Sequence, residues 1–273
     1  MALKVAVLST GGELPAGRWR KRRPAKPNPK IPPIRGFWII IAVLVIWQLV
    51  HSQHSAYYPA PSEWWSAVTT AWDSGKLGSG LRATALTFVL GIVLSTIIGS
   101  ALGILIGRVH WADRMLGPIL EYCRVLPAPV TVPIAVLFGG YSQETAVTVV
   151  VFSAIWPILL QVRTSAQRVP PEMLEMSHML RFGVAERVRK VILPGVAPGI
   201  VLGLRGAAPL ILISTLLVEL LTNMKGLGSL LLSAQDAYDS ALVYGLIVIL
   251  GILGVLLNMV IALAETRLRT RWR

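Results

Sequence analysis

The sequence predicts an all-α polytopic membrane protein with about six transmembrane helices. Hydrophobic residues make up 54% of the 273-residue chain, and long stretches are nearly free of charge. Each stretch is close to the ~20 residues that a helix needs to cross a bilayer, and backbone groups in hydrocarbon require helical hydrogen bonding. The predicted spans are 36–51, 81–107, 117–139, 144–162, 198–221 and 242–264. The first is short and the third contains prolines, which leaves five or seven spans as alternatives.

The positions of the basic residues predict how these spans are oriented. With six spans and a cytoplasmic N-terminus, 21 of the 26 Lys and Arg residues fall in cytoplasmic segments. This bias is the positive-inside rule, and it predicts that both termini are cytoplasmic. The net charge of +13 therefore reflects membrane topology, and nucleic acid is excluded as a main partner.

Proline content, charge and hydropathy divide the chain into five predicted parts. Residues 1–35 form a basic, proline-rich tail that we expect to be disordered and to touch anionic lipid. Residues 36–57 contain the first transmembrane helix, and 58–80 form an amphipathic segment in the outer membrane interface, where tryptophan is favoured. Residues 81–265 form the transmembrane core with a cytoplasmic loop at 163–194, and 266–273 form a second basic tail.

Small residues recur every four positions along the second predicted span. They are Gly91, Ser95, Gly99, Gly103 and Gly107. Such a row lets another helix approach closely, which is the main source of helix association in lipid. We expect the row to pack inside the chain's own helix bundle, with a contact between subunits as the alternative.

The third span carries Pro127, Pro129 and Pro133 within seven residues. Prolines remove backbone donors, and broken helices at membrane depth often border the substrate path of a transporter. A purely structural kink is the alternative. Trp156, in the next span, and Glu219, an ionisable residue near the outer end of the fifth span, are further candidates for the path.

Catalytic and cofactor motifs are missing from the sequence. No stretch fits G-x-x-x-x-G-K-[ST], so the chain is not expected to hydrolyse ATP alone. The four histidines and the single cysteine lack the spacing of a metal site. We therefore predict a non-catalytic chain without a cofactor or metal of its own.

The cytoplasmic loop opens with Pro170-Pro171, carries Glu175 and closes with Leu193-Pro194. It resembles the cytoplasmic signature of inner-membrane permeases in binding-protein-dependent ABC importers, in which Glu and Leu-Pro have this separation. Arg181 stands where that pattern has glycine, and Gly183 follows two residues later. The resemblance implies that the loop docks an ATPase through Leu174, Glu175, Met179, Leu180, Gly183, Leu193 and Pro194.

Further segments are similar to the sulfonate/taurine/nitrate permease subfamily over about residues 58–265. They are Tyr58-Pro59-Ala60-Pro61-Ser62, Arg124-Val125-Leu126-Pro127, Trp156-Pro157-Ile158-Leu159, Val218-Glu219-Leu220-Leu221 and Gly226-Leu227-Gly228. Their order along the chain is more specific than any one of them.

The resemblance implies a type I ABC importer permease in a bacterial inner membrane. Its expected partners are two ABC ATPase subunits that carry ATP and Mg, a second permease copy or paralogue, and an extracytoplasmic solute-binding protein. Sulfonate, taurine or nitrate is the expected solute, with bicarbonate, a thiamine precursor or riboflavin as alternatives. Two other classes stay open: an ion- or proton-coupled secondary transporter and a non-transporting membrane scaffold.

Overall fold

The computed structural model describes residues 34–50, 57–126 and 128–271, and the regular elements in these ranges are all helices. The chain divides into two compact units, Met1–Ile46 and Trp47–Arg273. Helix α1 (Ile34–Val50) provides the described part of the first unit and the first residues of the second. The predicted tail at 1–35 lies outside the described residues except for its last two positions, which begin α1.

Four helical segments are long and apolar enough to cross a membrane. They are α3 (Lys76–Arg108), α6 (Gln143–Gln167), the run 184–222 that ends in α9 (Leu193–Thr222), and α11 (Ser240–Arg271). They coincide with four of the six predicted spans. The other two predicted spans contain shorter apolar helices, α1 and α5 (Ala128–Gly139).

The third predicted span, 117–139, is not one continuous helix. Helix α4 (His110–Cys123) ends before Arg124, and α5 begins at Ala128. Pro129 is the second residue of α5, a position where the missing N–H costs nothing. Pro133 lies inside α5, whereas Pro127 lies outside the described residues.

The predicted second basic tail, 266–273, is helical in its described part, because α11 continues to Arg271. Glu265, just before this tail, connects α11 to α9. Its side chain is buried and accepts a hydrogen bond from Arg205 Nη1 at 2.9 Å, which fixes this end of α11 against α9.

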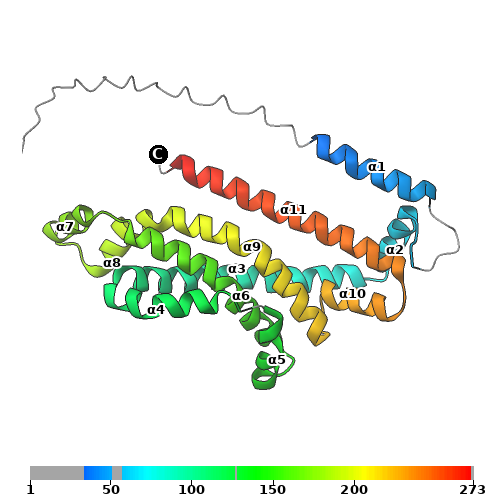
Figure 1. The fold of residues 1–273 in the computed structure, drawn as a ribbon, viewed down its shortest axis with the longest axis horizontal. Coiled ribbons are helices and arrows are strands. Elements are labelled where there is room, and N and C mark those ends of the chain that lie inside the picture. The colour runs from blue at the N-terminus through cyan, green and yellow to red at the C-terminus, as the bar shows by residue number, and fades with distance from the viewer. Residues whose placement is uncertain (1–33, 51–56, 127, 272–273) are drawn as a thin grey trace, which may run out of the picture. The chain divides into compact units, whose positions relative to one another are not determined.

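Helix α6 packs against both α3 and α9 in the second unit (Figure 1). On the α3 side, a Cβ added at Gly103 would lie 2.7 Å from the Leu159 carbonyl oxygen. On the α9 side, a Cβ added at Gly203 would lie 2.7 Å from Ile158 Cα. Both contacts are too close for a side chain, so glycine sets the separation of these helices. The predicted row on α3 therefore faces a helix of the same chain.

A second row of small residues, not recognised in the sequence, completes this packing. Gly195, Gly199, Gly203 and Ala207 also recur every four positions along α9, and the last three are buried. Val150, Ile158 and other apolar residues of α6 fill the core between the two rows. The spacing of small residues by four is the same as on α3 and was visible in the sequence.

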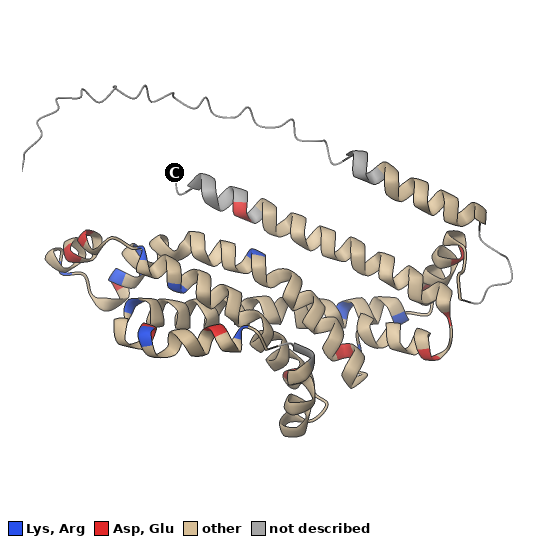
Figure 2. Ribbon diagram, viewed as in Figure 1, with Lys and Arg blue, Asp and Glu red and all other residues tan. Residues whose placement is uncertain are grey.

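The remaining helices are short. They are α2 (Pro61–Asp73), α7 (Pro171–Met179), α8 (Val184–Arg187), a π-helix η1 (Val188–Ile192) and α10 (Leu227–Asp236). Helices α7 and α8 lie near the end of the second unit where α3 leads into α4, and α2 and α10 lie near the other end (Figure 1). Charged residues gather toward these two ends, with few between them (Figure 2).

Helix α2 is amphipathic, as predicted for the segment 58–80. Trp64 is buried, donates its indole N–H to the Pro59 carbonyl at 3.1 Å and stacks on Tyr244 of α11. Trp65 and Trp72 are exposed on the same helix. The helix thus fixes one tryptophan in the fold and presents two others to its surroundings.

Candidate functional site

The segment from α7 to η1 contains a sharp turn. The distribution of basic residues predicts that this turn lies on the cytoplasmic side. Helix α7 ends in a Schellman motif: Phe182 N–H donates to the Ser177 carbonyl at 3.0 Å, and Arg181 N–H donates to the His178 carbonyl at 2.9 Å. This motif needs a left-handed residue, usually glycine, and Arg181 takes that conformation with φ 53°. The turn therefore forms without the glycine that the family pattern has at this position.

Gly183 does not replace the missing glycine. Its φ is −62°, a value open to any residue, and a Cβ there would meet no atom within 4 Å. It precedes α8, and its N–H donates to Glu186 Oε2 at 3.4 Å. Lys190 contacts two residues of the same turn. Its Nζ pairs with Glu186 at 2.9 Å and lies 4.7 Å from the Phe182 ring centroid.

Large apolar side chains are exposed around this turn. They are Met173, Met176, Met179, Leu180 and Val184, with Met179 reaching 82% exposure. A groove of about 420 Å³ runs beside them, with Phe182, Val191 and Pro194 in its lining. Exposed apolar surface rimmed by polar residues is typical of a protein-interaction site.

The predicted docking residues differ in their exposure. Glu175, Met179, Leu180, Gly183 and Leu193 are exposed, and Pro194 lines the groove. Leu174 is partly buried and packs against the main core, so it supports α7 from within rather than facing outward as expected. Met173 and Met176 face outward and were missed, although their spacing of three places them on one helical face.

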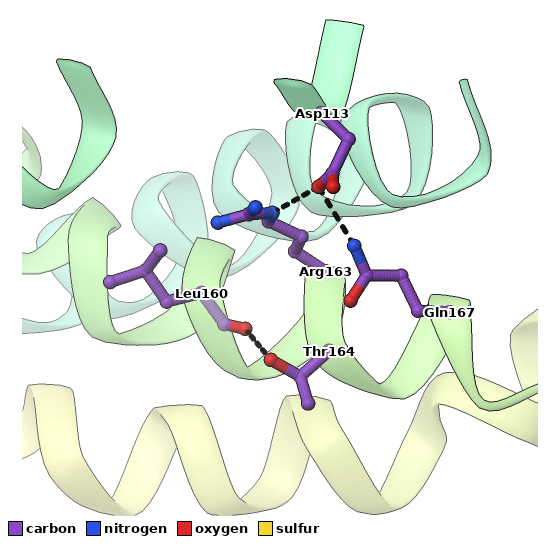
Figure 3. Close-up of polar contacts among 5 residues, drawn as sticks. All are labelled: Asp113, Leu160, Arg163, Thr164 and Gln167. Carbon is purple, nitrogen blue, oxygen red and sulfur yellow. Dashed lines mark hydrogen bonds and ion pairs between the residues drawn. The ribbon is translucent and has the colours of Figure 1, made fainter. Parts of the chain in front are cut away.

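A polar clamp joins the last turns of α6, which precede this segment, to α4 (Figure 3). Asp113 Oδ1 accepts hydrogen bonds from Arg163 Nε and, at 2.8 Å, from Gln167 Nε2. Arg108 Nη1 also donates to the Ala166 carbonyl at 3.1 Å. Asp113 and Arg163 are largely buried, so the pair fixes the C-terminal end of α6 to the first turn of α4.

Glu219 lies at the opposite end of α9 in a buried polar network. Its side chain is 2% exposed, and its Oε2 accepts hydrogen bonds from Thr84 Oγ1 and from Gly228 N–H, each at 2.9 Å. Leu227 N–H donates to Thr84 Oγ1 at 2.8 Å. A Cβ at Gly226 would overlap the Glu219 carboxyl group. Glu219, predicted as a candidate for the path, thus holds α3, α9 and the start of α10 together.

The other candidates for the path have different surroundings. Trp156 is partly buried and makes an edge contact with Phe152 at 5.4 Å between ring centroids, and its indole N–H has no hydrogen-bond partner among the described residues. Arg205 was not selected from the sequence, yet its side chain is 53% exposed within α9 while its partner Glu265 is buried. Among the described residues, no cluster of His, Cys, Asp or Glu could hold a metal ion.

Comparison with known proteins identifies the family. Residues 95–273 match the model described as "Binding-protein-dependent transport system inner membrane component". The chain belongs to this family. Its exposed α7–α8 turn corresponds to the loop that carried the resemblance in the sequence.

Named relatives agree with this assignment over most of their length. The bicarbonate transport system permease protein CmpB of Synechocystis sp. is 30% identical over 257 residues, covering 89% of each chain. The nitrate import permease protein NrtB of the same organism is 29% identical, covering 90% of this chain and 94% of the relative. The putative aliphatic sulfonates transport permease protein SsuC of Bacillus subtilis is 24% identical, covering 88% of each.

Solved structures support the fold. The inward-facing MetNI methionine ABC transporter matches 71% of this chain and 96% of its own, with a TM-score of 0.58 and 19% identity. A second match, to an amino acid ABC transporter, has a TM-score of 0.56 and 16% identity. The protein is thus an inner-membrane permease subunit of an ABC importer, a class of protein that works with ATPase and binding-protein partners.

Proposed function

We propose that two permease subunits, this chain and either a second copy or a paralogue, form the pore of an importer for a small oxyanion. One ATPase subunit would bind the α7–α8 turn of each permease subunit. An extracytoplasmic binding protein would deliver the solute at the opposite end of the pore. Both termini would then be cytoplasmic, as the positive-inside bias predicts.

The observation that carries the proposal is the exposed turn between α7 and α8. Its outward methionines and Leu180 form an apolar surface, whereas Ile192 and Val196, which follow it, belong to the core. A partner that binds this surface can therefore displace α9 together with α6, which packs against it, and the Asp113–Arg163 pair links α6 to α4. Closure of two ATPase subunits on ATP would switch the pore by rigid-body movement of these helices.

Oxyanion chemistry is the common property of the solutes named for the relatives, which are bicarbonate, nitrate and aliphatic sulfonates. Each presents negatively charged oxygens on a small planar or tetrahedral group. Arg205, half-exposed within α9, could attract such an ion, because a guanidinium group binds oxyanions through paired N–H donors.

ATP hydrolysis belongs to the partner in this proposal, because the chain has no phosphate-binding loop in its sequence. ATP and Mg would bind to the ATPase subunits, and this chain would act without a catalytic residue or a cofactor.

The first test is purification of the tagged full-length chain in mild detergent, followed by mass spectrometry of the bound proteins. An ATPase in the eluate is expected, and a different permease in the same eluate would indicate a heterodimer. Recovery of a folded chain without an ATPase in several detergents would contradict the docking proposal.

Reconstitution then separates the importer from a secondary transporter. Proteoliposomes that contain the purified complex and its binding protein should take up radiolabelled nitrate, bicarbonate or an alkanesulfonate only when ATP is supplied on the ATPase side. Uptake driven by an ion or proton gradient without ATP would instead identify a secondary transporter. If none of the three oxyanions is taken up with ATP, the substrate proposal is wrong while the class of transporter stands.

A further inference from the structure

The unusual backbone of Arg181 points to a role that the fold alone does not require. Three non-glycine residues in the described chain have positive φ: Arg181, Asn223 and Tyr238. Asparagine tolerates this region, but Arg and Tyr carry a steric cost there because their Cβ approaches the neighbouring backbone. At Arg181 the cost falls in the centre of the proposed docking turn.

The side chain of Arg181 is not used within the chain. It is exposed, and it makes no ion pair or side-chain hydrogen bond with another described residue. Two neighbouring cations differ in this respect, because Lys190 pairs with Glu186 and Arg187 Nη2 lies 3.1 Å from His178 Nδ1. The main chain of Arg181 closes the turn, but its strained conformation and its exposed side chain, which bonds to no described residue, are together best explained by an external contact.

The surroundings of Arg181 define what that contact would be. Leu180 precedes it, and Met179 and Val184 lie within three positions, so the guanidinium group emerges from an exposed apolar surface. Six Lys and Arg residues and three Glu residues fall between 163 and 190, which leaves the segment with a positive surplus. A carboxylate within an apolar pocket is the complementary partner.

We infer that Arg181 forms a charge-assisted contact with an acidic side chain of the ATPase subunit and thereby selects the cognate ATPase. The inference rests on the proposed function, because it requires that an ATPase binds the α7–α8 turn. It goes further in assigning specificity to the residue that departs from the glycine of the family pattern. Glycine would relieve the backbone but would lose the contact.

This assignment predicts opposite effects on stability and on binding. Arg181→Gly and Arg181→Asn should raise the melting temperature of the full-length chain by about 1–3 °C, because both residues accept positive φ. The same variants should bind the copurifying ATPase about tenfold more weakly, since a partly desolvated ion pair is lost. Arg181→Lys keeps the charge and the backbone cost, so its affinity should stay within about threefold of the unmodified chain.

Tyr238→Gly provides a matched control at a distant position of the second unit. Tyr238 has φ 56° and is exposed, so this variant should gain thermal stability without any change in ATPase binding. Affinity is measured with the detergent-solubilised full-length chain and the ATPase that copurifies with it, at low and at high salt. The unmodified chain should lose more affinity with salt than Arg181→Asn does, because screening weakens ionic contacts.

The outcomes separate this inference from the proposed function. If no ATPase binds the unmodified chain, the docking proposal itself fails. If an ATPase binds and both Arg181→Gly and Arg181→Asn bind it as tightly as the unmodified chain, the docking proposal stands and the specificity assignment is wrong. Weaker binding by these two variants together with unchanged binding by Arg181→Lys and Tyr238→Gly supports the assignment.

Discussion

The two ends of α9 differ in how far the chain itself covers their side chains. At the end that the charge bias predicts to be the outer one, Glu219 is buried, and its Oε2 is bonded to Thr84 and Gly228, whereas its Oε1 has no partner among the described residues. At the cytoplasmic end, the turn after α7 exposes Met176, Leu180 and other apolar residues. The difference fits a fixed geometry at the Glu219 end and the proposed binding of another protein at the α7–α8 turn.

Glu219→Ala should produce the largest change in stability. The substitution leaves the Thr84 hydroxyl and the Gly228 N–H buried without their acceptor, and buried polar groups without partners cost about 1–3 kcal/mol each. We expect a loss of about 2–5 kcal/mol in the free energy of unfolding. Fluorescence-detected size-exclusion chromatography after heating measures the effect.

Glu144→Ala is the matched control for this experiment, because Glu144 is an exposed carboxylate in the first turn of α6. The molecules of Glu219→Ala that remain folded should still bind the ATPase. Equal stability of the two variants would show that the outer network contributes little, and the contrast between the ends of α9 would then disappear.

Leu180→Glu should have the reverse effect of Glu219→Ala: it should weaken ATPase binding and leave stability nearly unchanged. Leu180 is exposed, so thermal stability should change little. Loss of the apolar contact and introduction of a charge should weaken ATPase binding by about 2 kcal/mol, or roughly 30-fold. The measurement is ATPase affinity, with Tyr57→Glu, an exposed site near α2, as a control that should bind normally. Normal ATPase binding by Leu180→Glu would remove this turn from the docking surface.

Asp113→Asn tests whether the cytoplasmic end also contains a fixed part. The amide cannot pair with Arg163 as a charged partner, although its oxygen can still accept from Gln167. We expect a loss of about 1–2 kcal/mol in unfolding free energy, and a double-mutant cycle with Arg163→Gln should show coupling between the two sites. Additive effects in that cycle would mean that the clamp in Figure 3 does not act as a unit.

The sequence was informative wherever a single segment decides the structure. The absence of charge identified the four long spans, and the period of four along α3 identified the helix face that packs on α6. The network at Glu219 could not be predicted in this way, because Thr84 lies 135 positions away in the chain. Only the folded arrangement brings these two residues together.

The turn after α7 illustrates a different limit. The family pattern has a glycine at the left-handed position, whereas this chain has Arg181 there and Gly183 two residues later. The structure instead places Arg181 in that conformation, because the hydrogen bonds from Arg181 and Phe182 to the end of α7 fix the backbone regardless of the side chain. Main-chain bonding therefore determined the turn, and the residue preference did not reveal it.

The smallest expected effect comes from Gly183, and the glycine that precedes a short helix at the other end of α9, Gly226, provides the contrast. Gly183 precedes α8 in open space, so Gly183→Asp should stabilise the turn by a few tenths of a kcal/mol, roughly the advantage of Asp over Gly at a helix N-cap. Gly226 precedes α10, and there a Cβ would displace the Glu219 carboxyl group from its buried hydrogen bonds, so Gly226→Asp should cost up to as much stability as Glu219→Ala. Melting temperatures of the two variants measure the difference. A Gly226→Asp variant as stable as the unmodified chain would contradict this difference, because the same substitution would then be tolerated at both ends of α9.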